Sequence, residues 1–178
     1  KGGHGATPHG TVDAVVVAAH IINSLQTIVS RNTNPLESTV VTVGMINGGY
    51  NFNIIADEVT LKGTTRSYTN ENRILIKNRM TEIISGAEKM FGAKINLKYK
   101  DGYPPTINDV ECTKNVISAI DKVIGEKNHA PYLSMGGEDF SYYLEKIPGC
   151  FFFVGSRPLD IKPLSIPHHC SHFDIDEK

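Results

Sequence analysis

The sequence predicts an α+β protein whose first hundred residues form an antiparallel sheet with two helices on one face. Two long segments carry apolar residues at helical spacing, and three short segments alternate in polarity or are rich in β-branched residues. Along the chain, a helical segment is followed by two strand segments, then by the second helical segment and the third strand segment. With 178 residues, 40% of them hydrophobic and 21% charged, the chain has the size and composition of one large globular domain or two small ones.

The first predicted element is a helix over about residues 11–31. Thr11 comes before the apolar pattern and is of a type that caps helices, so we expect it to be the N-cap. Pro35 lies in a polar segment that ends the helix. The expected buried stripe consists of Val15, Ala18, Ile22, Leu25 and Val29, widened by Ile21 and Ile28.

Strands and a second helix follow. Residues 39–45 are β-branched and residues 58–65 alternate in polarity, so each segment predicts a strand. Helical spacing returns over residues 70–91, and a third strand is predicted at Ile95, Leu97 and Tyr99. If a further strand lies at or before Lys1, the order is β-α-β-β-α-β, which is the ferredoxin-like arrangement.

The chain changes character after Tyr103, where two prolines follow. We therefore expect a first domain over residues 1–103 and a different segment over residues 104–178. That segment contains a predicted helix over about residues 108–126 and an apolar run at residues 149–155, typical of a strand buried on both faces. Because such a strand needs a layer on each side, we expect the segment to be part of an α/β domain in a longer protein.

Charge and cysteine content exclude several classes of protein. The net charge of −1 gives no field that would gather polyanions, so we expect no nucleic-acid partner. No uninterrupted apolar stretch approaches the roughly 20 residues of a membrane span, so we expect no membrane partner either. The three cysteines form no C-x-x-C pair and no even set, which favours free thiols and a cytoplasmic location.

Five of the seven histidines lie in two short segments. Neutral imidazole is a common metal ligand and titrates near neutral pH, so each segment is a candidate site. The alternative is a solvated histidine-rich surface, which spacing alone makes the more frequent explanation. Neither segment has the H-E-x-x-H or zinc-finger spacing. The histidines concerned are His4 and His9 in the first segment and His168, His169 and His172 in the second.

Three further features could bind a ligand. The turn at Gly136 and Gly137 could let the backbone approach a ligand, with Glu138 as an acid-base or amine-binding group. A plain turn, with its carboxylate favourably placed at a helix start, is the alternative. Arg66 could hold a carboxylate in a bidentate pair, although a surface ion pair is commoner. Asn53 has the position of an ordinary turn residue.

Read in order, six segments resemble the dinuclear-metal amidohydrolases, a family of aminoacylases, hippurate and indole-acetyl-amino-acid hydrolases, N-acetyldiaminopimelate deacetylases and related carboxypeptidases. Two motifs, YPPTIND and GGEDFSYYL, look like the branch that cleaves N-acyl amino acids. The matching segments cover nearly the whole chain: residues 1–9, 25–49, 52–67, 102–109, 134–155 and 168–177.

In that family a β-α-β-β-α-β lid, which also dimerises, interrupts an α/β catalytic domain. The resemblance implies that residues 1–103 are the lid and residues 104–178 the C-terminal part of the catalytic domain. It also implies a homodimer that hydrolyses N-acyl amino acids or small peptides with a metal-activated water. Two divalent metal ions (zinc, manganese, cobalt or nickel) would serve the full-length enzyme. In the family, the other metal ligands and the general-base glutamate lie upstream of the lid. We therefore expect this chain to be inactive by itself, and it need not bind the metal ions.

The resemblance also implies a role for each candidate residue. His169, four residues before Phe173, matches a metal ligand. His4 matches the lid histidine that reaches a neighbouring subunit's site and stabilises the tetrahedral oxyanion. Asn53 and Arg66 match residues that hold the substrate carboxylate. The pocket-lining loop corresponds to Gly136, Gly137 and Glu138.

The chain departs from the family pattern in two places. Ala56 stands where the family usually has proline, which should alter the rigidity of the turn more than the chemistry. Cys170 and Ser171 replace the usual residues after the ligand histidine, so His168 is a rival to His169 for the metal.

Two other classes of function stay open. One is a free-standing ferredoxin-like dimerisation or small-molecule-binding module, against which the GGEDF motif and the second apolar run argue. The other is a catalytically dead homologue of the enzyme. Only the upstream ligands would distinguish that homologue from an active enzyme.

Overall fold

The computed structural model of the chain describes residues 1–125, 129–158, 161–162 and 170–177. The chain divides into two compact units. Unit 1 comprises residues 1–106 and 130–142, and unit 2 comprises residues 107–129 and 143–178. Helices and small antiparallel sheets together confirm the predicted α+β class.

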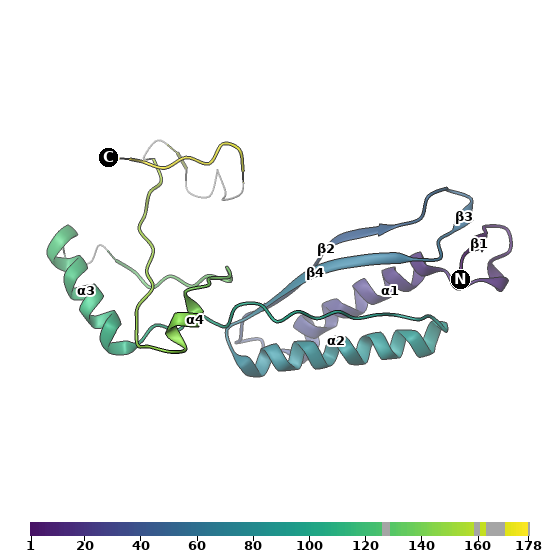
Figure 1. The fold of residues 1–178 in the computed structure, drawn as a ribbon, viewed down its shortest axis with the longest axis horizontal. Helices are drawn as coiled ribbons and strands as arrows, with labels where there is room; N and C mark the ends of the chain where they lie inside the picture. The colour runs from purple at the N-terminus through teal and green to yellow at the C-terminus, as the bar shows by residue number, and fades with distance from the viewer. Residues whose placement is uncertain (126–128, 159–160, 163–169, 178) are drawn as a thin grey trace. The chain divides into compact units, whose positions relative to one another are not determined.

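Unit 1 is built on a long antiparallel pair of strands, β2 (Thr39–Gly48) and β4 (Val59–Ser67) (Figure 1). Both predicted strands are confirmed, and β2 continues three residues beyond the expected end. A register shift between Val43 and Met45 marks a bulge in β2. A second, shorter antiparallel pair joins β1 (Gly3–His4) to β3 (Ile54–Ile55).

Helices α1 (Ala14–Thr27) and α2 (Asn70–Phe91) both lie on one face of the β2–β4 pair (Figure 1). A π-helical turn, η2 (Ile28–Asn32), continues α1. Helix α2 has the predicted bounds. The Thr69 side chain caps its start, and Gly92 ends it with a φ of 64°, in the left-handed region that glycine adopts readily.

The N-cap predicted for α1 is wrong. Asp13 caps the helix, because its carboxylate accepts the N–H groups of Val15 at 2.9 Å and Val16 at 3.2 Å. The Thr11 hydroxyl instead donates to the carbonyl of Pro8 at 2.8 Å and closes the short 3-10 turn η1 (Pro8–Gly10). The residue that caps the helix is therefore two positions after the one that sequence spacing favoured.

The core of unit 1 lies between the two helices and the β2–β4 pair. Ile28 is fully buried and Ile76 is 1% exposed. The predicted α1 stripe is partly wrong, since Val15 and Val29 are exposed. A helix start in which almost every residue is apolar does not define which face is buried. The buried cluster consists of Val17, Ile21, Leu25, Ile28, Val41, Ile76 and Ala87.

The predicted third strand forms no ladder in the described part of the chain. Its alternation is nevertheless present: Ile95, Leu97 and Tyr99 are half-buried, while the residues between them are exposed. Two side-chain contacts replace the ladder. The N–H of Ile95 donates to Glu88 Oε1 at 2.7 Å, and the Tyr99 hydroxyl lies 2.9 Å from Thr65 Oγ1.

By length and composition alone, the helical stretch Ala14–Asn32 could cross a membrane, contrary to the expectation drawn from apolar run lengths. It supplies four members of the buried cluster, Val17, Ile21, Leu25 and Ile28. We therefore interpret it as the core helix of unit 1.

Unit 2 contains α3 (Val110–Ile124), which confirms the helix predicted after the two prolines. The short helix α4 (Ser141–Leu144) spans the junction between the units. Residues 149–155 form no strand, and Phe153 and Val154 are 63% and 78% exposed. The expectation of a strand buried on both faces is therefore wrong for the described chain, which provides no layers to cover it. Asn108 fixes part of this run, since its amide exchanges two hydrogen bonds of 2.8 Å with the backbone of Phe151.

Candidate functional site

His4 and Asn53 lie side by side at the end of unit 1 that carries β1 and β3. His4 pairs with Ile54 in the β1–β3 ladder, and the N–H of Gly5 donates to the carbonyl of Asn53 at 2.9 Å. The approach is close because a Cβ on Gly5 would lie only 2.9 Å from that carbonyl oxygen. Two predicted site residues that are 49 positions apart in the sequence are thus brought together.

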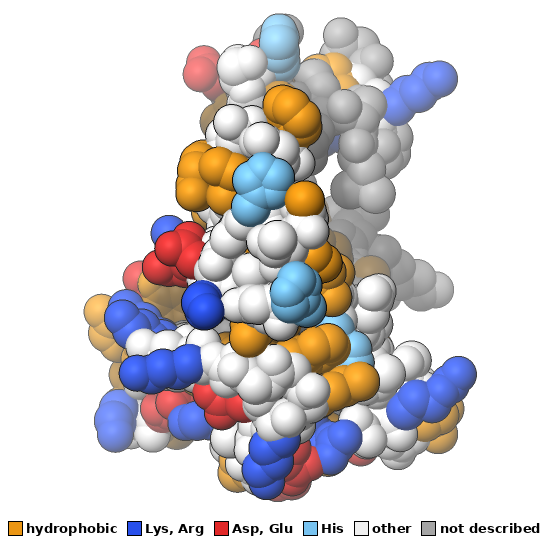
Figure 2. Space-filling view, turned by 90° about the vertical axis from the view of Figure 1, so that its right-hand side faces the viewer, with side chains coloured by type: hydrophobic (Ala, Val, Ile, Leu, Met, Phe, Trp, Pro, Cys, Tyr) orange, Lys and Arg blue, Asp and Glu red, His pale blue; other side chains and the backbone are white. Residues whose placement is uncertain are grey.

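One ring nitrogen of His4 accepts a hydrogen bond from the backbone. Its Nδ1 accepts the N–H of Ala6 at 3.1 Å, so in the neutral ring the proton lies on Nε2. The residue is exposed, and Nε2 is the atom left to donate. Figure 2 shows histidine side chains among hydrophobic ones on the surface at this end of unit 1. An exposed Nε2–H of this kind can donate a hydrogen bond.

Arg66 lies near the other end of β4, on the face that the helices leave open. Thr60, Lys62, Thr64 and Arg66 share that exposed face, while Thr65 on the opposite face contacts Tyr99. Among the described residues no carboxylate pairs with Arg66, unlike Arg79, which pairs with Glu82. An exposed guanidinium without an acidic partner is available to bind an anion.

The glycine turn lies next to Arg66. A Cβ on Gly137 would be 3.8 Å from Arg66 Nη1, so the two predicted site residues are neighbours in unit 1. Gly136 donates its N–H to Ser134 Oγ at 3.1 Å. Glu138 Oε1 accepts the N–H of Phe140 at 3.2 Å, which is the turn geometry of the alternative interpretation. A substrate-binding role for Glu138 stays a prediction.

The predicted site residues thus form two groups within one chain. His4 and Asn53 lie before the start of β4, whereas Arg66 and Gly137 lie near its end. Val59 and Arg66 are seven positions apart along the strand, about 23 Å at the usual rise of a strand. One protomer does not bring all of these residues around one small molecule.

The predicted metal ligand lies outside the described residues, as does its rival: His169 and His168 both belong to that part of the chain. The described residues contain no group of three or more His, Cys, Asp or Glu side chains that could hold a metal ion. His172, the described histidine of the second segment, has its Nδ1 3.2 Å from Ser171 Oγ. The described residues therefore do not form a dinuclear metal centre.

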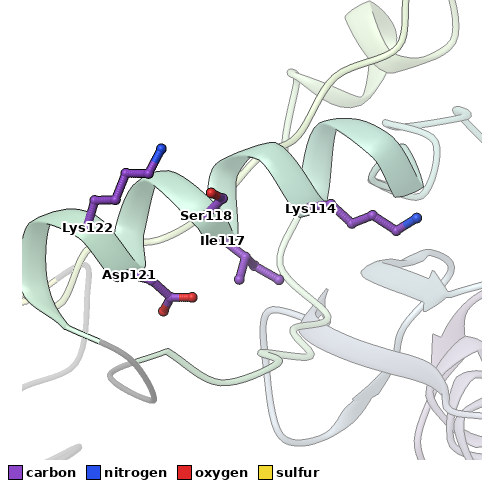
Figure 3. A pocket seen from close by; sticks show the side chains of 5 residues that line it. All are labelled: Lys114, Ile117, Ser118, Asp121 and Lys122. Atoms are coloured by element: carbon purple, nitrogen blue, oxygen red, sulfur yellow. The ribbon is translucent and has the colours of Figure 1, made fainter.

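A shallow hollow of about 450 Å³ lies along α3 in unit 2 (Figure 3). One face of a single helix lines it, and none of its residues belongs to the predicted site. At the start of the same helix, the N–H of Cys112 donates to Asp109 and lowers the pKa of that carboxyl. Burial first, and the Asp109 carboxylate second, raise the pKa of the Cys112 thiol, which disfavours a reactive thiolate. The lining residues of the hollow are Lys114, Ile117, Ser118, Asp121 and Lys122.

Tyr103 is a further residue of the site, in addition to those that the sequence predicts. Its ring lies against the glycine turn, since a Cβ on Gly137 would be 3.2 Å from Tyr103 Cδ2. The residue lies in the motif YPPTIND, which carries the family resemblance, and it also marks the expected end of the first domain. An aromatic residue inside a family-like motif was the signal that could have identified it.

Comparison with known proteins identifies the family of the first half of the chain. The peptidase dimerisation domain, M20_dimer, matches residues 1–89. The N-acetyl-L-cysteine deacetylase of Bacillus subtilis is 44% identical over 157 residues, which cover 88% of this chain and 37% of that protein. The N-acetyldiaminopimelate deacetylase of Enterococcus faecalis is 39% identical over 179 residues, covering 100% of this chain and 46% of that protein.

Among solved structures, the YXEP protein of Bacillus subtilis, described as a dinuclear metal binding peptidase from the M20 family, has a TM-score of 0.66. It is 28% identical, and the match covers 80% of this chain and 36% of that one. The chain therefore spans less than half the length of each of these relatives.

Proposed function

The chain belongs to the M20 peptidase dimerisation family, and from this membership we propose that it forms the lid and C-terminal segment of an amidohydrolase that cleaves N-acyl amino acids. Water would add to the amide carbonyl and the C–N bond would break, giving a carboxylic acid and a free amino acid. The two deacetylase relatives support this substrate class, because both are named for substrates that carry an N-acetyl group. Small peptides are included in the proposed substrate class, because they also carry an amide bond next to an amino acid with a free carboxylate.

The observation that carries the proposal is the exposed Arg66 beside the Gly136–Gly137 turn, for which the described part of the chain supplies no carboxylate partner. A guanidinium binds a carboxylate through two parallel hydrogen bonds, which fixes both the position and the orientation of the substrate. The lack of side chains in the turn leaves room next to the guanidinium. These features fit the carboxylate end of an N-acyl amino acid.

The second part of the proposal is that two protomers complete each site. Because His4 and Asn53 lie at the end of the lid away from Arg66, we assign them to the site of the neighbouring protomer. There, His4 Nε2–H would donate to the oxygen that becomes negative when water adds to the amide. The amide side chain of Asn53, beside it, would orient the acyl end. The dimerisation domain supports a homodimer of this kind.

We also propose that the full-length enzyme depends on two divalent metal ions, of which zinc, manganese, cobalt and nickel are the candidates. The solved M20 relative, which is described as dinuclear, supports this. Two bound divalent metal ions would lower the pKa of water and so make it a better nucleophile at neutral pH. Within the described residues, the part we assign to this chain is substrate binding, orientation and charge stabilisation. His169, which lies outside them, stays the metal ligand that we propose for this chain. The free thiols of Cys112, Cys150 and Cys170 support a cytoplasmic location.

The test is the release of free amine from N-acetyl amino acids by the full-length protein, before and after dialysis against a chelator. We expect hydrolysis that the chelator abolishes and that divalent metal restores. The His4→Ala variant should bind substrate but lose most of its turnover. The control is His20→Ala, which should keep its turnover. His20 lies on α1, and its ring centroid is 5.1 Å from that of Phe91. Absence of hydrolysis in the metal-loaded wild type would reject the proposal in favour of a binding module or a dead homologue.

A further inference from the structure

We propose that Tyr103 determines side-chain specificity: its ring forms the wall against which the side chain of the substrate amino acid lies when Arg66 holds the carboxylate. The inference rests on the proposed function, because it takes an amino acid with a free carboxylate as the ligand. It adds a residue to the site and a property of the substrate that this residue selects.

The position of the ring is the first argument. Tyr103 Cδ2 and Arg66 Nη1 both surround the point where Gly137 lacks a side chain, at 3.2 Å and 3.8 Å. The ring and the guanidinium are therefore no more than about 7 Å apart. Any side chain at position 137 would begin to fill the space between them.

The dimensions of an amino acid are the second argument. When a carboxylate oxygen accepts a hydrogen bond of about 2.8 Å from Arg66, the Cβ of the bound amino acid lies about 5 Å from the guanidinium nitrogen. A side chain that starts there reaches van der Waals distance, about 4 Å, of a ring within 7 Å. Glycine, which has no side chain, would not make this contact.

The packing of the ring is the third argument. Tyr142 meets Tyr103 edge to face, with the ring centroids 5.7 Å apart and an interplanar angle of 78°. Tyr103 is nevertheless 51% exposed, so one side of the ring is supported and part of its surface is open to a ligand. A supported aromatic surface binds apolar groups at a low entropic cost.

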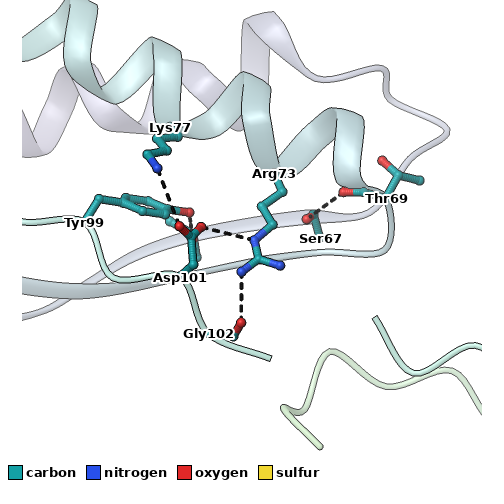
Figure 4. A network of polar contacts seen from close by, with 8 residues as sticks. Ser67, Thr69, Arg73, Lys77, Tyr99, Asp101 and Gly102 are labelled. Atoms are coloured by element: carbon teal, nitrogen blue, oxygen red, sulfur yellow. Dashed lines mark hydrogen bonds and ion pairs between the residues drawn. The ribbon is translucent and has the colours of Figure 1, made fainter. Parts of the chain in front are cut away.

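The polar contacts shown in Figure 4 fix the two residues before Tyr103 to the same body that carries Arg66. Arg73 Nη2 donates to the carbonyl of Gly102 at 2.9 Å, and its Nε lies 3.4 Å from Asp101 Oδ1. Lys77 Nζ lies 3.5 Å from Asp101 Oδ2. Because Tyr99 of the same segment bonds to Thr65 of β4, the position of the ring is defined relative to the neighbouring Arg66.

The experiment compares N-acetyl-L-phenylalanine with N-acetylglycine in the full-length protein. The value of kcat/KM is measured with the metal-loaded protein for wild type, Tyr103→Ala and Tyr103→Phe. The dissociation constant is measured by isothermal titration calorimetry on the same proteins after a chelator has removed the metal, so that the substrate is not consumed. The matched controls are Tyr103→Phe, which keeps the ring, and Met90→Ala, which removes an exposed apolar side chain at the far end of α2.

We expect Tyr103→Ala to weaken binding and kcat/KM for N-acetyl-L-phenylalanine by roughly tenfold, the typical value of one aromatic contact, with less than a twofold effect on N-acetylglycine. Tyr103→Phe and Met90→Ala should stay within about twofold of wild type for both substrates. An equal loss for both substrates in Tyr103→Ala, or a Phe variant as weak as the Ala variant, would overturn the inference. Binding without hydrolysis in the wild type would reject the hydrolase proposal but still decide the role of Tyr103, and no binding of either substrate would reject both.

Discussion

Asn53 and Arg66 lie at opposite ends of strand β4. Asn53 lies before Val59, the first residue of the strand, and Arg66 lies next to its last residue, Ser67. The family resemblance implied that both residues hold one carboxylate, but a single chain places about 23 Å of strand between the two ends. Asn53 instead lies beside His4 at the β1–β3 corner, where the Asn53 carbonyl accepts the N–H of Gly5 and His4 pairs with Ile54. This arrangement leads to a dimer in which each site takes one group from each protomer.

The first prediction is that two inactive variants of the full-length protein will complement each other. His4→Ala and Arg66→Ala should each lose most of their activity alone. After the two variants are mixed under conditions that let subunits exchange, half of the dimers carry one of each, and one of their two sites is intact. Activity should therefore recover to about a quarter of the wild-type value in a symmetric dimer.

The control for that experiment is a mixture of His4→Ala with Asn53→Ala. We assign these two residues to the same group, so each heterodimer would have one changed residue in each of its two sites. No recovery is expected from this mixture beyond the activities of the parents. Recovery of equal size in both mixtures would contradict the assignment of Asn53 to the group of His4.

The second prediction concerns the carboxylate partner. Arg66→Ala should lower kcat/KM for N-acyl amino acids roughly 100-fold, because hydrogen bonds to a charged group are lost. This corresponds to a loss of about 3 kcal/mol of transition-state stabilisation. Arg66→Lys should recover only part of this, since lysine lacks the planar pair of donors. The matched surface control is Arg79→Ala, whose guanidinium pairs with Glu82 on α2 and should leave kcat/KM unchanged. An N-acyl amine without a carboxylate should show little difference between Arg66→Ala and wild type.

Much of unit 1 follows from local patterns. The bounds of α2 agree with the prediction because its polar face, Thr69 cap and Gly92 end are all encoded within the segment itself. The strands β2 and β4 are likewise encoded by β-branching and alternation. Where the local pattern is ambiguous the prediction fails, as in α1, whose almost entirely apolar start lets either face be buried.

Other features depend on contacts between distant segments and could not be predicted. The alternation of Ile95, Leu97 and Tyr99 gives the correct buried face, but whether a ladder forms depends on a neighbouring strand. The closeness of Arg66 to Gly137 joins residues 71 positions apart, which no spacing rule contains. Residue types alone likewise gave no indication that Asn53 and Arg66 would be separated.

The third prediction tests the core of unit 1 with two isoleucines on the same helix. Ile76 is 1% exposed, whereas Ile74 is 60% exposed. Ile76→Ala should lower the free energy of unfolding by about 2–5 kcal/mol, because it removes buried methyl groups and leaves a cavity. Ile74→Ala should change it by less than about 0.5 kcal/mol. Urea denaturation followed by far-UV circular dichroism measures both, and equal effects would show that the helix packs on a different face.

The fourth prediction tests which residue begins α1. Asp13→Ala should lower the free energy of unfolding by about 1 kcal/mol, because two N–H groups of the first turn lose their acceptor. Thr11→Val, which removes a hydroxyl bonded only within η1, should cost less. Glu58→Ala, an exposed carboxylate outside any helix, controls for the loss of charge. A larger effect at Thr11 than at Asp13 would restore the cap predicted from spacing.

The fifth prediction concerns the thiol at the start of α3. Burial and the carboxylate of Asp109 raise the pKa of Cys112, so at a given pH less of it is thiolate and its alkylation by iodoacetamide should be slow. Asp109→Asn keeps an oxygen that can accept the N–H of Cys112 but removes the negative charge. The pKa of the thiol should then fall, and the pH profile of alkylation should shift to lower pH with a few-fold gain in rate near neutrality.

Glu111→Gln is the matched control, because Glu111 is the weakest of the neighbours that raise the pKa of Cys112. Its profile should lie close to that of the wild type. Peptide mass spectrometry distinguishes Cys112 from Cys150 and Cys170 in each sample. Since the Asp109 carboxyl has a lowered pKa, it stays ionised across the whole range of the experiment, and its own titration cannot produce the shift. An unchanged profile in Asp109→Asn would contradict a role for the Asp109 charge and leave burial as the largest cause of the raised pKa of Cys112.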